Sequence, residues 1–118
     1  MRTDQARVAL AAAVAAVDGV TGHAHRPGAA RPGDAWPLLR RLEPSTFGTC
    51  TATFDLIICL SGDDESAERA QDRWAVALVD ALSAACLTVT AVTPTTYLIG
   101  GTDLFVLAVT VLNEVENR

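Results

Sequence analysis

The chain contains no lysine, so its nine basic residues are all arginine, and its formal net charge at pH 7 is −5. Aromatic residues make up only 5% of its 118 positions. Proteins that recognise nucleic acid carry basic patches, and those that hold single strands add aromatic side chains on which the bases stack. An acidic chain with few aromatic residues is therefore not expected to recognise nucleic acid.

Long apolar segments are also missing. The run VALAAAVAAV, residues 8–17, has ten residues, which is too short to cross a bilayer. Asp4 precedes the run and no small-residue cleavage site follows it, so we do not expect a secretory leader. We therefore predict no membrane partner for this chain.

Cysteine is scarce, and no Cys-x-x-Cys pair occurs among Cys50, Cys59 and Cys86. Cys50 and Cys59 lie nine positions apart on one predicted strand, so their side chains point to opposite faces and cannot bond to each other. We expect reduced thiols that act as small core residues.

Apolar residues at helical spacing predict two helices. The first runs from about Asp4, a candidate N-cap, to Val17, and Gly19 is expected to end it. The second begins after Ser61 or Asp63 and carries an exposed pair of opposite charges, Glu65 and Arg69. Its predicted core stripe is Trp74, Leu78, Ala81 and Ala85, flanked by Ala70, Ala77 and Leu82.

Alternating patterns predict the strands. From Cys50 to Leu60 every second residue is apolar, whereas the other set begins with threonines and Asp55 and ends with Ile57 and Cys59. AWPLLRRLEP, residues 35–44, predicts a strand at a sheet edge because it contains Pro37. These two strands form a long hairpin whose tip, residues 44–48, is expected to protrude. LTVTAV, residues 87–92, predicts a further strand, and residues 95–112 predict a hairpin turned at residues 100–101.

This order of elements predicts one α+β domain over residues 1–118, with a mostly antiparallel sheet, two helices and a protruding long β-hairpin. Residues 57–60 and 104–112 are apolar on both faces, although an antiparallel sheet commonly has one polar face. Either the helices straddle the sheet, or its second face is buried against another copy of the chain. We favour assembly.

No motif for catalysis is present. Ser45 and Ser61 lack the G-x-S-x-G context of a nucleophile elbow, and the glycine pair at 100–101 lacks the spacing of a phosphate-binding loop. Helix capping explains the acidic run at residues 63–65. We predict neither enzymatic activity nor a cofactor.

The segment HAHRPGAARPGDAWP, residues 23–37, holds most of the candidate interaction residues. His23 and His25 supply two imidazoles, and Asp34 is the only acid nearby, which is too few ligands for zinc. Arg26 and Arg31 could bind phosphate, but a proline-rich loop that contacts another protein is the favoured interpretation. Trp36 anchors the end of the loop in the core or in an interface. The predicted protein-interface residues are Arg26, Arg31, Trp36, Arg40 and Arg41.

The order of elements, with the phrases VDGVTGHAHRPG, GDAWPLL, FGTCTATFDLIICL and GGTDLFVLAVTV, resembles the small tail terminator proteins of long-tailed, siphovirus-type bacteriophages, particularly those of actinobacteria. The resemblance covers nearly the whole chain. It implies a virion protein, made in the host cytoplasm, that forms a hexameric ring. Such a ring caps the tail tube, ends its polymerisation and presents a surface to the head–tail connector or stopper protein.

The resemblance further implies an α+β subunit whose sheets meet around a central channel. A negative net charge suits a channel through which DNA passes without specific binding, and Thr53 and Asp55 are the candidate channel-lining residues. The expected partners are copies of the chain itself, the tail tube protein and the connector. Two alternatives remain: another neck or tail-completion protein of the same fold, and a cellular dimeric α+β domain that binds a ligand or a metal through His23 and His25.

Overall fold

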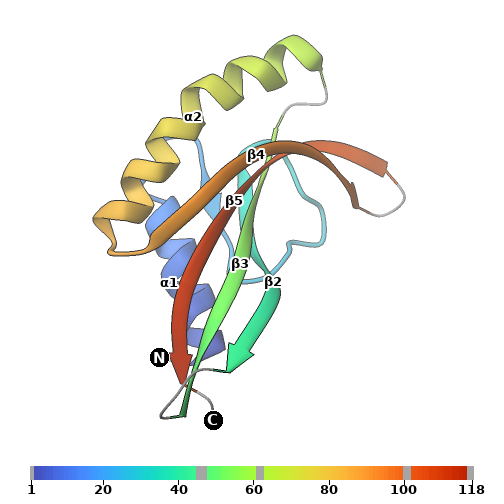
Figure 1. Cartoon of the computed structure of the whole chain (residues 1–118). Coiled ribbons are helices and arrows are strands. Elements are labelled where there is room, and N and C mark those ends of the chain that lie inside the picture. Colours follow the sequence, from blue (N-terminus) through green and yellow to red (C-terminus); the bar gives the residue numbers. More distant parts are fainter. Residues whose placement is uncertain (1, 45–47, 61–62, 100–101, 117–118) are drawn as a thin grey trace.

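The computed structural model describes residues 2–44, 48–60, 63–99 and 102–116. They form an α+β domain, as predicted, with one five-stranded sheet in the order β1-β2-β3-β5-β4 (Figure 1). Only the short pair of β1 and β2 is parallel, and the other neighbours are antiparallel. In chain order, the elements are α1 (Thr3–Val14), β1 (Thr21–Gly22), β2 (Asp34–Pro44), β3 (Thr49–Cys59), α2 (Asp64–Ala84), β4 (Thr88–Ile99) and β5 (Thr102–Glu116).

α1 differs from the predicted helix at both ends. Its N-cap is Arg2, whose backbone N–H donates to Oε1 of Gln5 at 2.8 Å, and Asp4 lies in the first turn. The helix ends at Val14, so Gly19, with φ at +84°, belongs to the following turns and does not end the helix. An alanine-rich run is helical only where it is docked, and its composition therefore does not mark where the helix stops.

α2 begins as predicted, because the Asp63 carboxylate accepts a hydrogen bond from the backbone N–H of Ser66 at 3.0 Å. The other candidate cap, at position 61, lies outside the described residues. The predicted stripe is wrong at position 85, where the alanine is exposed, whereas Ala81 is half-buried and packs against the main core. The helix ends at residue 84 and Cys86 turns the chain away with φ at +62°, so the stripe stops one turn early. Its buried residues are Ala67, Ala70, Trp74, Leu78 and Leu82.

The predicted hairpin is formed by β2 and β3, which pair from Ala35↔Ile58 to Pro44↔Cys50. β2 is a sheet edge beyond Ala35, as Pro37 predicts. β5 pairs with the whole of β3, from Thr49↔Glu116 to Cys59↔Val106, so β3 lies inside the sheet along its full length. The hairpin tip at residues 45–47 lies outside the described residues, and its protrusion stays a prediction. β4 is one continuous strand through Pro94, and the turn at 100–101 is also outside the described part of the chain.

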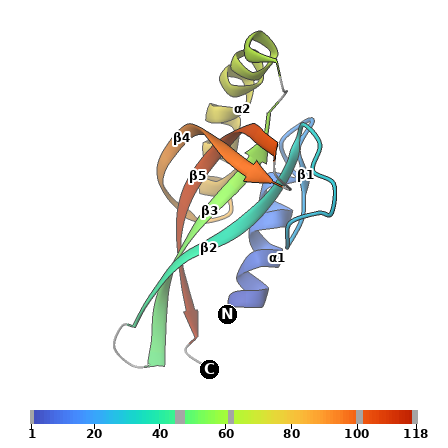
Figure 2. The same cartoon turned by 90° about the vertical axis from the view of Figure 1, so that its right-hand side faces the viewer.

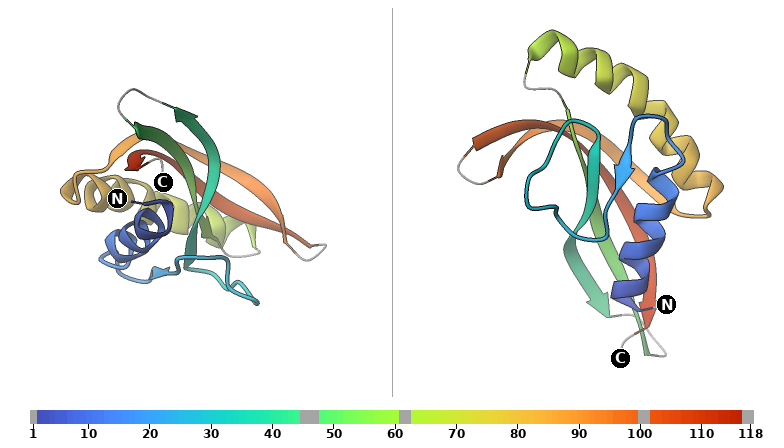
Figure 3. Two further views of the ribbon diagram at one scale, coloured as in Figure 1. Left: turned by 90° about the horizontal axis from the view of Figure 1, so that it is seen from below. Right: turned by 180° about the vertical axis from the view of Figure 1, so that it is seen from behind.

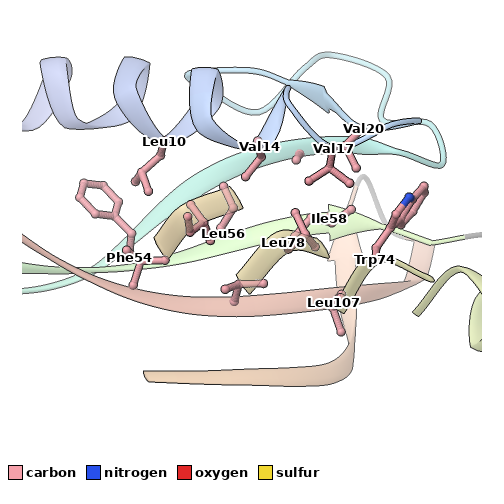
Figure 4. Packing of buried hydrophobic residues seen from close by; sticks show 14 of the residues in the cluster. Leu10, Val14, Val17, Val20, Phe54, Leu56, Ile58, Trp74, Leu78 and Leu107 are labelled. Carbon is pink, nitrogen blue, oxygen red and sulfur yellow. The ribbon is translucent and has the colours of Figure 1, made fainter. Parts of the chain in front are cut away.

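Both helices lie on the same face of the sheet, so they do not straddle it (Figure 3). The alternation in β3 decides which side chains meet them, because Phe54, Leu56 and Ile58 all point to this face and are fully buried. Figure 4 shows the main core between the two layers. Its labelled members are Leu10, Val14, Val17, Val20, Phe54, Leu56, Ile58, Trp74, Leu78 and Leu107.

The opposite face, here called the far face, has a smaller core of its own. Trp36, Ile57, Cys59, Val106 and Ala108 are buried there, with Ala30, Leu38, Tyr97 and Leu104 packed against them. The curved β4–β5 hairpin and the loop before β2 close over this end of the sheet (Figure 2). The apolar residues on both faces of β3 and β5 are therefore buried within one chain. These apolar residues do not need a second copy of the chain to cover them. The expectation of assembly therefore does not follow from the two apolar faces of the strands.

Candidate protein-interaction surface

The loop at residues 23–33 is fixed at both ends by hydrogen bonds. His23 N–H donates to the carbonyl oxygen of Ala35 at 2.8 Å, and Gly33 N–H donates to that of Cys59 at 2.8 Å. Gly33 has φ at +94°, and a Cβ there would lie 2.4 Å from the carbonyl oxygen of Gly19, so only glycine fits. The loop that joins β1 to β2 is thus held in a fixed path, and it packs on the far face of the sheet.

A pair of side chains closes the base of this loop. His23 Nε2 lies 3.0 Å from Oδ1 of Asp34, and Oδ2 of Asp34 accepts from the backbone N–H of Arg31 at 2.9 Å. Burial raises the pKa of the Asp34 carboxyl, but these hydrogen bonds and the nearby charges of His23 and Arg31 outweigh it, and the net pKa is below its usual value. In the part of the chain that the structure describes, no three His, Cys, Asp or Glu side chains gather as metal ligands. His23 is used to hold the loop, and His25 is exposed.

The predicted interface residues of this segment separate into surface and core. Arg26 and Arg31 are exposed on the loop. Trp36 is only 2% exposed and packs edge-to-face against Tyr97, with ring centroids 6.5 Å apart. Of the two roles predicted for Trp36, the core anchor is the one seen in this chain. Ala30 of the loop packs against the small core that contains Trp36.

The other end of the far face is polar and carries a network across three strands. Arg40 Nε donates to Oδ2 of Asp55 at 2.6 Å, and the Thr110 hydroxyl donates to Oδ1 at 3.0 Å. The register of β2 shifts between Leu39 and Arg41, and this bulge leaves Arg40 as the extra residue beside Asp55. Sequence reasoning identified Asp55 but missed Thr110, which only the pairing Asp55↔Thr110 places opposite it.

We call this polar end the open face, because no helix lies over it (Figure 3, left). Thr53 lies between Arg41 and Leu112 in register, and Arg41 makes a long, exposed contact of 3.5 Å with Glu43. The Asp55 carboxylate is therefore paired with Arg40, and the strand register places Thr51, Thr53 and Thr110 on the same face. The open face comprises Arg40, Arg41, Glu43, Thr51, Thr53, Asp55, Thr110, Leu112 and Glu114.

Comparison with protein-family models, with curated proteins and with solved structures finds no match to this chain. No helix within the described ranges is long and apolar enough to cross a membrane. The open face, the exposed arginines of the loop and the sequence resemblance are therefore the features that bear on function.

Proposed function

We propose that this chain is a structural subunit of a phage virion, which assembles with copies of itself into a ring that caps the tail tube. The ring, hexameric as the resemblance implies, ends tube polymerisation and joins the tail to the head-side connector. The observation that carries this proposal is the one-sided packing of the sheet. With both helices on one face, the polar end of the other face is left uncovered, as a sheet that lines a central channel requires.

The chemistry of the open face supports a channel lining. DNA slides past a wall most easily when the wall neither attracts phosphate nor offers stacking platforms. Thr51 and Thr53 are uncharged, Arg40 is paired with Asp55 at 2.6 Å, and the exposed Arg41 has Glu43 as its partner at 3.5 Å. An overall charge of −5 further disfavours retention of DNA.

The exposed arginines supply the contacts that assembly needs. Arg26 and Arg31 lie on a loop whose ends are fixed, so docking this loop costs less conformational entropy than docking a free arm. Arg40 and Arg41 lie on the edge strand β2, at the border of the open face to which they belong. We assign the tube protein and the connector, with copies of the chain itself, as the partners of these surfaces.

The test is the native mass of the full-length protein, alone and after mixing with polymerised tail tube protein. A closed ring in solution, or a monomer that becomes a ring on tube ends and stops their growth, is the expected result. A chain that binds the head connector but ignores tubes would instead indicate another neck protein. A dimer that binds neither would overturn the assignment to a phage tail.

A further inference from the structure

A groove lies between the N-terminal half of α2 and β4, with a volume of about 300 Å³. Its floor is apolar and consists of Leu60, Ala67, Phe105 and Val106, of which only Phe105 is partly exposed. Two carboxylates, Asp64 and Glu68, line its rim from α2, and both are exposed. A groove with an apolar floor and an acidic rim suits a short segment that carries a cation beside apolar atoms.

The charges of the rim are not neutralised by any ion pair among the described residues. Neither Asp64 nor Glu68 has a salt bridge among the described residues, although the adjacent Glu65 is paired with Arg69 at 2.6 Å. Asp72 adds a further exposed carboxylate one helical turn beyond Glu68. Two such acidic rims repel each other, so a symmetric contact of groove against groove is disfavoured.

The complementary element of this chain is the loop at residues 23–33. Arg26 is exposed there between His25 and Pro27, and its side chain makes no salt bridge within the described ranges. The loop presents a guanidinium next to a proline ring, which pairs a cation with an apolar surface. Its ends are held by β1, β2 and the His23–Asp34 contact, so this segment is shaped before it binds.

Within one chain, no residue of this loop lines the groove. The loop joins β1 and β2 at one edge of the sheet, whereas β4, which borders the groove, is the strand at the other edge (Figure 2). Pro32 of the loop borders a separate hollow beside Ser66 and Arg73 of α2, and neither Asp64 nor Glu68 lines that hollow. The two complementary surfaces therefore do not meet within one subunit.

We propose that Arg26 and the adjoining residues of one copy dock in the α2–β4 groove of the next copy, with the guanidinium between Asp64 and Glu68. This inference rests on the proposed function only in that the chain assembles with copies of itself. A contact between different surfaces of identical subunits is head-to-tail, and it closes into a ring when the rotation between subunits allows it.

The test is a charge exchange between the two surfaces, with two full-length variants measured by sedimentation velocity. R26E places an acid in the loop, and E68R places a cation in the groove, where Asp64 and Asp72 at i−4 and i+4 support it on the helix. Each variant alone should self-associate about tenfold or more weakly than wild type, because R26E sets an acid against the acidic rim, and E68R replaces one of the two carboxylates that bind Arg26 with a cation. An equimolar mixture should recover assembly, since the acidic loop of R26E then meets the cation in the E68R groove, and the Arg26 loop of E68R meets the unchanged acidic groove of R26E.

The control is D80R, which makes the same change of charge on α2 outside the groove and should assemble like wild type. Circular dichroism melts of all variants check that each one folds. Variants that assemble as well as wild type, or a mixture that recovers nothing, would overturn the docking while leaving ring formation intact. A wild-type chain that stays monomeric at its highest soluble concentration would also overturn it. The proposed function is tested separately, by mixing the wild-type protein with polymerised tail tube protein.

Discussion

Arg40 and Arg41 are adjacent in sequence and were predicted to play the same part, yet the bulge in β2 gives them different surroundings. Arg40 lies 2.6 Å from Asp55, whose side chain is only 16% exposed and also accepts from Thr110. Arg41 contacts Glu43 at 3.5 Å, and both of these side chains are more than half exposed. A charge pair stabilises a protein more when one partner is withdrawn from water, because the unpaired carboxylate would otherwise lose solvation without compensation.

We therefore expect R40A to lower the free energy of unfolding by about 1–3 kcal/mol. R41A is the matched control and should change this free energy by no more than about 0.5 kcal/mol. Urea unfolding of the two variants and of wild type measures both values. Equal effects at the two positions would contradict the role assigned to the Arg40–Asp55–Thr110 network.

At the scale of elements, the structure depends on the close approach of β1 to α1. Gly22 lies in β1, and a Cβ built there would be 2.1 Å from the carbonyl oxygen of Ala11 in the helix. No side chain can occupy that space unless α1 moves away from the sheet. The alanines of α1 contribute little buried area each, so the helix depends on this short distance for its contacts.

G22A should accordingly destabilise the protein by about 1–3 kcal/mol or more, because the new methyl group forces α1 and β1 apart. G28A is the control, since Gly28 has no heavy atom within 4 Å of its added Cβ. That variant should be neutral or slightly more stable through the reduced entropy of its unfolded chain. Thermal melts followed by circular dichroism compare the two. A G22A protein with wild-type stability would show that β1 does not approach α1 this closely.

At the scale of the whole molecule, the three cysteines report on three different environments. Cys50 is buried in the main core under the helices, Cys59 in the small core of the far face, and Cys86 is exposed. Burial, together with the negative charge of Asp34, raises the pKa of the Cys59 thiol to about 11. The thiolate is the reactive form, so neither buried cysteine should react readily in the folded protein.

We expect one rapidly reacting thiol in the native protein at pH 8 and three in urea, with the fast reaction abolished by C86S.

The raised pKa of Cys59 also predicts a pH effect on the free energy of unfolding. An unfolded cysteine ionises from about pH 8.5, whereas folded Cys59 stays protonated. The contribution of the protonated Cys59 thiol to the free energy of unfolding is thus fully present below about pH 8.5 and is lost as the pH rises towards 11. In C59A, the free energy of unfolding should fall less between pH 9 and 11 than it does in the wild-type protein. A fast-reacting Cys59 in the wild-type protein would contradict the closed second core.

Much of the fold was predictable because some local signals outweigh any tertiary effect. The alternation through β3 indicated which side chains face each side, and Asp63 was a correct N-cap for α2. The errors occurred where local signals were weak or absent. Alanine favours a helix without marking its end, so α1 was extended past Val14. For the candidate site, the sequence singled out Asp55 and the arginines but could not pair them, since pairing depends on register and on a one-residue bulge.

The sequence by itself determined the α+β class, the types of the elements and the two apolar sets of β3, because hydrophobic periodicity and capping act over a few neighbouring residues. Only the tertiary structure decided how the second apolar set is covered. The helices share one face, and the far face is closed by the loop before β2 and by the curved β4–β5 hairpin. Sheet curvature and loop path depend on contacts between residues far apart in the chain, such as Ala30 with the core around Trp36. Such contacts produce no periodic pattern in the sequence. The sequence therefore could not show whether the second apolar face is covered by the same chain or by another copy.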